Sequence, residues 1–191
     1  MKIILASGSP RRKELLKLVV PDFEILISEI DEKLEEGLTP QEQVTRLAYK
    51  KAKDVYGKTN GDRIVIGADT VVTKNGKIYG KPKDRNDAKQ MLKELVEGDK
   101  MHSIITGLCV IINKDGKYKE YITSDEVKVF LKNMSDDEIE KWLNTGNAMD
   151  KAGAYGIQNE FCVFVDKIGG NYSTAVGLPT QKLYDCIKEF I

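Results

Sequence analysis

Apolar residues in this sequence gather into short β-branched runs, and segments with helical spacing separate these runs. The clearest run covers residues 64–72 and predicts a buried strand. Shorter runs predict further strands at residues 3–6, 23–27, 103–112, 121–123, 127–131 and 163–168. A hairpin is predicted at residues 71–79, because Asn75-Gly76 is the strongest short-range signal for such a turn.

Helices are predicted from their start signals and from apolar residues at helical spacing. Ser9 is a suitable N-cap and Pro10 a suitable first residue for one helix. We expect its buried face to comprise Leu15, Leu16, Leu18 and Val19. A second helix begins at a capping box, Thr39 to Glu42, and ends at Gly57. Other helices are expected around residues 88–95, 135–143 and 183–190. Because strands and helices alternate irregularly, with two hairpins, we predict an α/β fold with a mixed sheet.

Asp69 interrupts the central apolar run with a carboxylate. A buried charged carboxylate is costly unless a cation or several hydrogen-bond donors meet it. We therefore expect a metal ion or a Lys or Arg side chain to face Asp69; the alternative is that it caps a turn at a strand end. Gly67 and Ala68 favour a functional site, because small residues let a ligand approach the backbone.

Composition limits the classes of protein to consider. The chain has 191 residues, and we expect residues 1–191 to form a single domain with its own core. Acidic and basic residues balance at 30 each, which gives no sign of a nucleic-acid partner or an anionic membrane partner. No apolar run approaches the length of a membrane span.

The cysteines and the N-terminal residues indicate a compartment. Cys109, Cys162 and Cys186 are odd in number and widely spaced, so they form neither a metal pattern nor a disulfide framework. The apolar stretch before Ser7 is too short for a signal peptide. We therefore expect a cytoplasmic protein.

A phosphate-binding segment is predicted at the start of the first helix. Ser7, Ser9, Arg11 and Arg12 stand beside free backbone amides at the positive end of the helix dipole. Arginine side chains match phosphate oxygens in pairs. The alternative, a solvated first turn, fits less well because basic residues are unfavourable at that end. The sequence has no P-loop and no Gly-x-Gly-x-x-Gly motif.

Several other polar residues are candidates for the same site. The acidic patch at residues 29–32 supplies carboxylates, although alone it would be a solvated loop. Lys81 follows the hairpin, and an antiparallel return brings it back towards Asp69. The small residues at 150–157 suit a loop that approaches a flat ligand, and Gln158 has the donor and acceptor needed to contact a base edge. His102, the only histidine, has no partner visible in the sequence, and we expect a structural role for it rather than that of a general base.

Seven motifs together resemble the Maf family, the septum-formation-inhibitor-like nucleoside triphosphate pyrophosphatases. They occur in the family's order across almost the whole chain: residues 5–12 with 14–16, residues 46–48 with 51–52, residues 67–72, Gly80-Lys81-Pro82, His102 with Thr106-Gly107, residues 150–158, and Gly177-Leu178-Pro179.

The resemblance implies a fold, a reaction and a cofactor. The implied fold is a single α/β domain of two lobes around a long mixed β-sheet with flanking helices, similar to inosine triphosphate pyrophosphatases. The implied reaction cuts a nucleoside triphosphate between its α and β phosphates, with a divalent cation, Mg or Mn, as cofactor. An aspartate has an ordinary pKa of ~4 and is a weak base at neutral pH, so this metal would have to acidify the attacking water.

The resemblance also assigns residues. It implies that Asp69 is the proton acceptor and, with Glu32, lies near the metal, although Asp31 leaves that register open. The implied phosphate-binding positions are Ser7, Ser9, Arg11, Lys51 and Lys81. Arg12, Thr70 and Gln158 resemble the branch that acts on dTTP and UTP, whereas Asn159 departs from the glycine common at its position. A homodimer is expected from the resemblance alone. Two alternative functions are a nucleotide-binding regulator of cell division with incidental hydrolysis, and a housekeeping enzyme for modified pyrimidine nucleotides.

Overall fold

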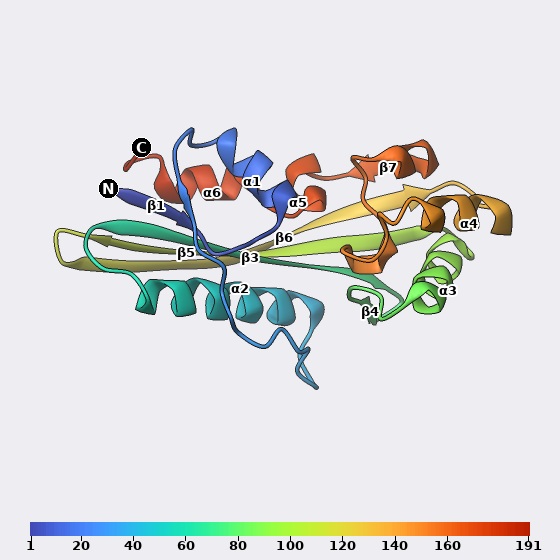
Figure 1. Ribbon diagram of the computed structural model, residues 1–191, viewed down its shortest axis with the longest axis horizontal. Helices are drawn as coiled ribbons and strands as arrows, with labels where there is room; N and C mark the ends of the chain where they lie inside the picture. The colour runs from blue at the N-terminus through green and yellow to red at the C-terminus, as the bar shows by residue number, and fades with distance from the viewer. The chain divides into compact units, whose positions relative to one another are not determined.

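The computed structural model describes residues 1–191 and shows a mixed α/β architecture with a seven-stranded sheet. The strands are β1 (Lys2–Leu5), β2 (Glu24–Ile25), β3 (Arg63–Lys74), β4 (Lys77–Tyr79), β5 (Met101–Lys114), β6 (Lys117–Leu131) and β7 (Val165–Gly169). The helices are α1 (Pro10–Lys17), α2 (Pro40–Gly57), α3 (Arg85–Val96), α4 (Asp136–Asn144), α5 (Tyr172–Val176) and α6 (Thr180–Ile187), with 3-10 turns η1 (Ala152–Ala154) and η2 (Glu160–Phe164). Figure 1 shows these elements.

The sheet is mixed, as predicted. Its hydrogen-bonding order is β2-β1-β3-β5-β6-β7, and β4 pairs with β3 beside this path. β1 is parallel to β2 and β3, whereas β4 is antiparallel to β3 and β7 is antiparallel to β6. The chain divides into two compact units, to both of which β3, β5 and β6 contribute.

Unit 1 comprises residues 1–70, 106–125 and 177–191. In this unit α2 lies on one face of the strands, and α1 and α6 lie on the other (Figure 1). A cluster of buried apolar side chains joins α2 to the strands: Ile4, Ala6, Ala48, Ala52, Val55, Val65, Cys109 and Ile111.

Unit 2 comprises residues 71–105 and 126–176. Its core packs aromatic residues of the segment after α4 against α3 and α4, and the indole of Trp142 donates to the carbonyl of Ala154 at 2.9 Å. His102 is 1% exposed and its Nε2 is hydrogen-bonded to the hydroxyl of Tyr155. This burial supports the structural role predicted for His102.

The predicted start signals of the helices are confirmed with one correction. The capping box at Thr39 and Glu42 forms, and α2 ends at Gly57 as expected. Helix α1 begins at Pro10, but the Ser9 side chain makes no capping hydrogen bond. Because α1 ends at Lys17, Leu18 lies beyond it and is 79% exposed, so its predicted place in the buried face is wrong.

Strand lengths differ most from the prediction. The two strands expected at residues 121–123 and 127–131 form one strand, β6, which begins directly after the turn at Asp115-Gly116. Exposed residues, most of them polar, fill the first half of β6, so apolar runs reveal only residues 121–123 of that half. Conversely, only two residues of the predicted strand at 23–27 pair, and the segment before β7 is the 3-10 turn η2.

All three cysteines are free, as the spacing predicted. None of the helices combines the length and the apolar character needed to cross a membrane.

Candidate active site

Close packing of α2 on the sheet places Lys51 opposite Asp69. A Cβ atom at Gly67 of β3 would lie 2.3 Å from the carbonyl oxygen of Ala48, and one at Gly107 of β5 would lie 2.3 Å from that of Val44. Only glycine therefore lets the helix backbone approach both strands this closely. The space beside Gly67 is filled by α2, so the expectation that a ligand would approach the backbone at Gly67 is wrong.

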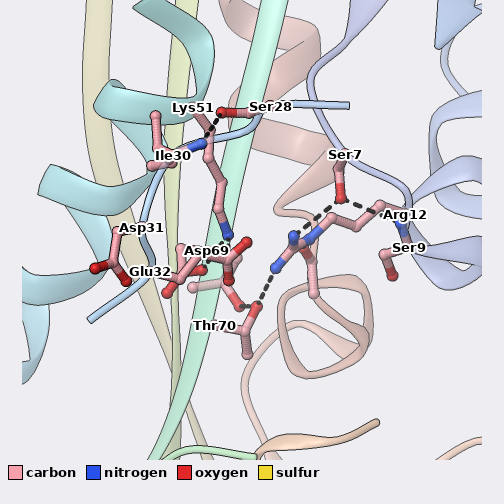
Figure 2. Close-up of polar contacts among 12 residues, drawn as sticks. Ser7, Ser9, Arg12, Ser28, Ile30, Asp31, Glu32, Lys51, Asp69 and Thr70 are labelled. Carbon is pink, nitrogen blue, oxygen red and sulfur yellow. Dashed lines mark hydrogen bonds and ion pairs between the residues drawn. The ribbon is translucent and has the colours of Figure 1, made fainter. Parts of the chain in front are cut away.

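Three charged side chains meet where α2 crosses β3. The ammonium nitrogen of Lys51 lies 2.7 Å from Oδ1 of Asp69 and 3.0 Å from Oε2 of Glu32 (Figure 2). The side chains of Lys51 and Asp69 are only 5% and 10% exposed, whereas that of Glu32 is half exposed. The expectation that a cation faces Asp69 is thus confirmed, and in this structure the cation is Lys51.

The neighbouring carboxylate of Asp31 does not join this cluster. Asp31 pairs with the exposed Lys33 at 2.9 Å, which lowers the pKa of its carboxyl mainly through the hydrogen bond from Lys33. The structure therefore brings Glu32, and not Asp31, to Lys51.

The guanidinium of Arg12 in α1 contacts three other residues of unit 1. Its Nε donates to the carbonyl of Gly177 at 2.9 Å, Nη1 to Oγ of Ser7 at 3.2 Å, and Nη2 to Oγ1 of Thr70 at 3.2 Å. Burial lowers the pKa of Arg12 below its ordinary value, while the nearby charges of Asp69 and Glu32 act in the opposite direction. The three hydrogen bonds orient the guanidinium, and its charge lies close to Asp69.

Alternation along β3 explains why Lys51 and Arg12 both reach this strand. Gly67 and Asp69 point to the face that α2 covers, and Thr70 points to the opposite face. Figure 2 shows Lys51 and Arg12 on opposite sides of β3. β1 pairs with residues 63–66 and β4 with residues 72–74, so neither of these two strands pairs with the residues between.

Two residues that were not predicted for the site, Thr106 and Gly177, help to position Arg12 and Thr70. The hydroxyl of Thr106 in β5 lies 3.0 Å from that of Thr70, and Thr106 is completely buried. Gly177 has a φ of +121°, and a Cβ there would lie 3.3 Å from Oγ1 of Thr70. The sequence signals were a hydroxyl within an apolar run and a glycine before Leu178-Pro179, and neither indicates which partner is contacted.

Eight of the ten residues predicted for the site belong to unit 1: Ser7, Ser9, Arg11, Arg12, Glu32, Lys51, Asp69 and Thr70. Lys81 and Gln158 belong to unit 2, and both are exposed. The participation of all ten residues in a catalytic site stays a prediction.

The donor set fits a divalent cation that arrives together with a phosphate ligand. No group of three or more His, Cys, Asp or Glu side chains converges in the chain. Asp69 and Glu32 do converge, on the single nitrogen of Lys51. Magnesium is typically held by one or two carboxylates together with waters and substrate phosphates, so two carboxylates suffice for this arrangement.

Comparison with models of protein families identifies the family of this chain. The family model described as Maf-like protein matches residues 2–190. The chain belongs to this family. As a Maf-like protein it has the motif residues Asp69, Lys51 and Arg12 gathered within one unit.

Sequence similarity to named proteins is consistent with membership of this family. The dTTP/UTP pyrophosphatase of Acetivibrio thermocellus is 49% identical, covering 100% of this chain and 96% of its own. The proteins of the same name from Alkaliphilus oremlandii and Clostridioides difficile are 50% and 45% identical, covering 95% and 100% of this chain and 92% and 95% of their own. Among solved structures, the Ham1 protein of Staphylococcus aureus aligns over 99% of both chains, with 16% identity and a TM-score of 0.49, a likeness too weak to support an argument.

Proposed function

We propose that this Maf-like protein hydrolyses dTTP and UTP to the nucleoside monophosphate and pyrophosphate. The observation that carries the proposal is the buried carboxylate of Asp69, which lies within hydrogen-bond distance of Lys51 in a chain whose relatives are named dTTP/UTP pyrophosphatase. Modified pyrimidine nucleotides are included in the proposed substrate class.

The reaction needs a base for water and cations for the phosphates. In the proposal, Asp69 takes a proton from a water molecule whose oxygen attacks the α-phosphorus, and the bond to the bridging oxygen of the β-phosphate breaks to release pyrophosphate. Because Lys51 donates to Oδ1 of Asp69, we assign the proton to Oδ2. Asp69 and Glu32 would hold a Mg or Mn ion, which supplies a more acidic water and neutralises phosphate charge.

In the proposal, the phosphate groups of the substrate are bound by Ser7, Ser9, Arg11, Lys51 and Lys81. Ser7 offers the clearest support. Its Oγ already accepts hydrogen bonds from Nη1 of Arg12 and from the backbone amide of Ser9, at 3.2 and 3.3 Å. A serine hydroxyl has two acceptor positions and one hydrogen, so the hydrogen of Ser7 is left to donate to an anionic ligand.

Selection of the pyrimidine base is assigned to Arg12, Thr70 and Gln158. Three of the five N–H groups of Arg12 bind protein oxygens, one from each nitrogen. One N–H on each of Nη1 and Nη2 is thus left over for a ligand. Gln158 is exposed and has both a donor and an acceptor for a base edge.

The alternative function, a regulator of cell division with incidental hydrolysis, is favoured by no contact in the structure, and we do not propose it. A homodimer and a cytoplasmic location stay expectations.

The test is pyrophosphate release from a panel of triphosphates with Mg²⁺ or Mn²⁺: dTTP, UTP, a base-modified pyrimidine triphosphate, CTP, ATP and GTP. We expect the dTTP and UTP reactions to yield monophosphate and pyrophosphate in equal amounts. Preference for a purine triphosphate would contradict the substrate assignment. Release of orthophosphate without pyrophosphate would contradict the proposed position of cleavage.

A further inference from the structure

Thr106 is a completely buried polar side chain beside the candidate site. It lies on β5, and its Oγ1 is 3.0 Å from Oγ1 of Thr70 on β3. A hydroxyl that is taken out of water without a partner costs free energy, so a buried threonine is stable here only because it is hydrogen-bonded. The resemblance to the family assigns no role to this side chain.

The chemistry of Arg12 restricts how the two threonine hydroxyls are arranged. A guanidinium can only donate, so Nη2 of Arg12 occupies an acceptor position of Thr70 Oγ1. Thr70 then either donates its hydrogen to Thr106 or accepts a second hydrogen bond from it. In both arrangements Thr70 Oγ1 lies between Arg12 on one side and Thr106 on the other.

This bridge fixes the rotamer of Thr70. Threonine has a methyl and a hydroxyl on Cβ, and rotation about χ1 by one staggered step can bring the methyl to the position that the hydroxyl held. Without the hydroxyl of Thr106, one of the two hydrogen bonds that hold Oγ1 in place is lost. A turned Thr70 would present its methyl group to Arg12. The hydrogen bond from Nη2 to Thr70 would then be lost, and only two of the three hydrogen bonds that orient the guanidinium would remain.

We propose that Thr106 is a positioning residue for substrate selection: its hydroxyl holds that of Thr70 against Arg12, and so sets the direction of the two N–H groups that Arg12 has left for the base. This inference rests on the proposed function, in which Arg12 and Thr70 select the pyrimidine. Thr106 acts through Thr70 and contacts no reacting atom.

The test compares Thr106→Val, which keeps the shape and removes the hydroxyl, with Thr106→Ser, which keeps the hydroxyl. Thr174→Val is the matched control, because Thr174 is equally buried and lies in α5 of unit 2. For each protein, kcat and KM are measured for UTP and for GTP, together with the thermal unfolding midpoint. Thr106→Ala, which also lacks the hydroxyl, replaces the valine variant if that variant does not fold.

We expect Thr106→Val to reduce the ratio of kcat/KM for UTP over GTP by about fivefold to tenfold, the usual effect of losing one hydrogen bond. Thr106→Ser should restore the ratio, and Thr174→Val should leave it unchanged. A crystal structure of the valine variant should show the Thr70 methyl turned towards Arg12.

Three results overturn the inference. If Thr106→Val keeps the wild-type ratio while Arg12→Lys lowers it, the role of Thr106 is refuted and the proposed function stands. If Thr174→Val lowers the ratio as much as Thr106→Val does, the effect is a general one of losing a buried hydroxyl. A wild-type protein that releases no pyrophosphate from UTP refutes the proposed function as well.

Discussion

The ammonium nitrogen of Lys51 lies 2.7 Å from Oδ1 of Asp69, and both side chains are at least nine-tenths buried. The pair joins the longest helix, α2, to a central strand of the sheet, β3. Because both charges are largely shielded from solvent, each depends on the other for its stabilisation. The pair therefore contributes to the fold and to the proposed chemistry at the same time.

Removal of the Lys51 charge should destabilise the protein. Lys51→Met keeps the length of the side chain but leaves Asp69 buried without the cation that contacts it. Glu32 brings only another negative charge, and the guanidinium of Arg12 binds other oxygens. We expect the free energy of unfolding to fall by roughly 3–5 kcal/mol, measured by urea denaturation at pH 7.

Lys50→Met is the matched control for this change. Lys50 is the preceding residue of α2 and pairs with Glu35 at the surface. Its substitution should alter the urea midpoint little, because exposed ion pairs are weak. Equal effects at the two positions would contradict the buried-pair account.

Gly67→Ala should separate α2 from β3. The new Cβ would lie 2.3 Å from the carbonyl of Ala48, so either the helix or the strand must shift. We expect a loss of about 1–3 kcal/mol in stability, as for other overpacked sites, and reduced pyrophosphate release because Lys51 moves with the helix. Gly57→Ala on the same helix, where nothing lies within 4 Å, should retain both properties. Unchanged activity in Gly67→Ala would show that the close approach is not needed.

His102 should make stability depend on pH. Burial, and next the nearby charge of Lys74, lower the pKa of His102 from 6.5 to about 3, while Asp99 acts in the opposite direction. The folded protein therefore holds His102 neutral, and the unfolded chain takes up a proton below about pH 6.5. The contribution of neutral His102 to the free energy of unfolding is fully present above that pH and is lost as the pH falls towards 3.

The measurement is the free energy of unfolding at pH 6.5 and at pH 4, for wild type and for His102→Asn. The wild type should lose about 3 kcal/mol more than the variant over this interval. Parallel pH dependence in the two proteins would refute the burial argument. The comparison with the variant removes the contribution of carboxylates that titrate in the same range.

Glu32 and Asp31 are adjacent acids that should behave differently. Glu32 contacts Lys51, whereas Asp31 pairs with Lys33 away from the cluster. We expect Glu32→Gln to raise the Mg²⁺ concentration needed for half-maximal pyrophosphate release by roughly tenfold or more, and Asp31→Asn to leave it near the wild-type value. The reverse order would assign the metal to Asp31.

Local chemistry made a large part of the fold predictable. The capping box of α2 and the Asn75-Gly76 turn each depend on residues within four positions of one another, and both form as expected. Asp69 was recognisable as a site because a lone carboxylate in an apolar run needs a partner. These signals required no knowledge of distant contacts.

The features that the sequence did not reveal depend on long-range packing. The small residue Gly67 indicates space for a ligand, yet α2 fills that space, and nothing in residues 64–72 identifies the occupant. The bond from Arg12 to Gly177 joins residues 165 positions apart. Likewise the polar first half of β6 becomes a strand only because a neighbouring strand pairs with it.

The central claim is that Asp69 activates water against a phosphoanhydride. Its most direct measurement is the kcat for pyrophosphate release from UTP by Asp69→Asn, with Asp54→Asn as a control. Asp54 is a partly buried carboxylate on α2 that pairs with Lys58 outside the site. We predict that Asp69→Asn lowers kcat by roughly 100-fold or more while the folded state is retained, and that Asp54→Asn stays near the wild-type rate. A folded Asp69→Asn variant that turns over UTP as fast as the wild type would contradict the account.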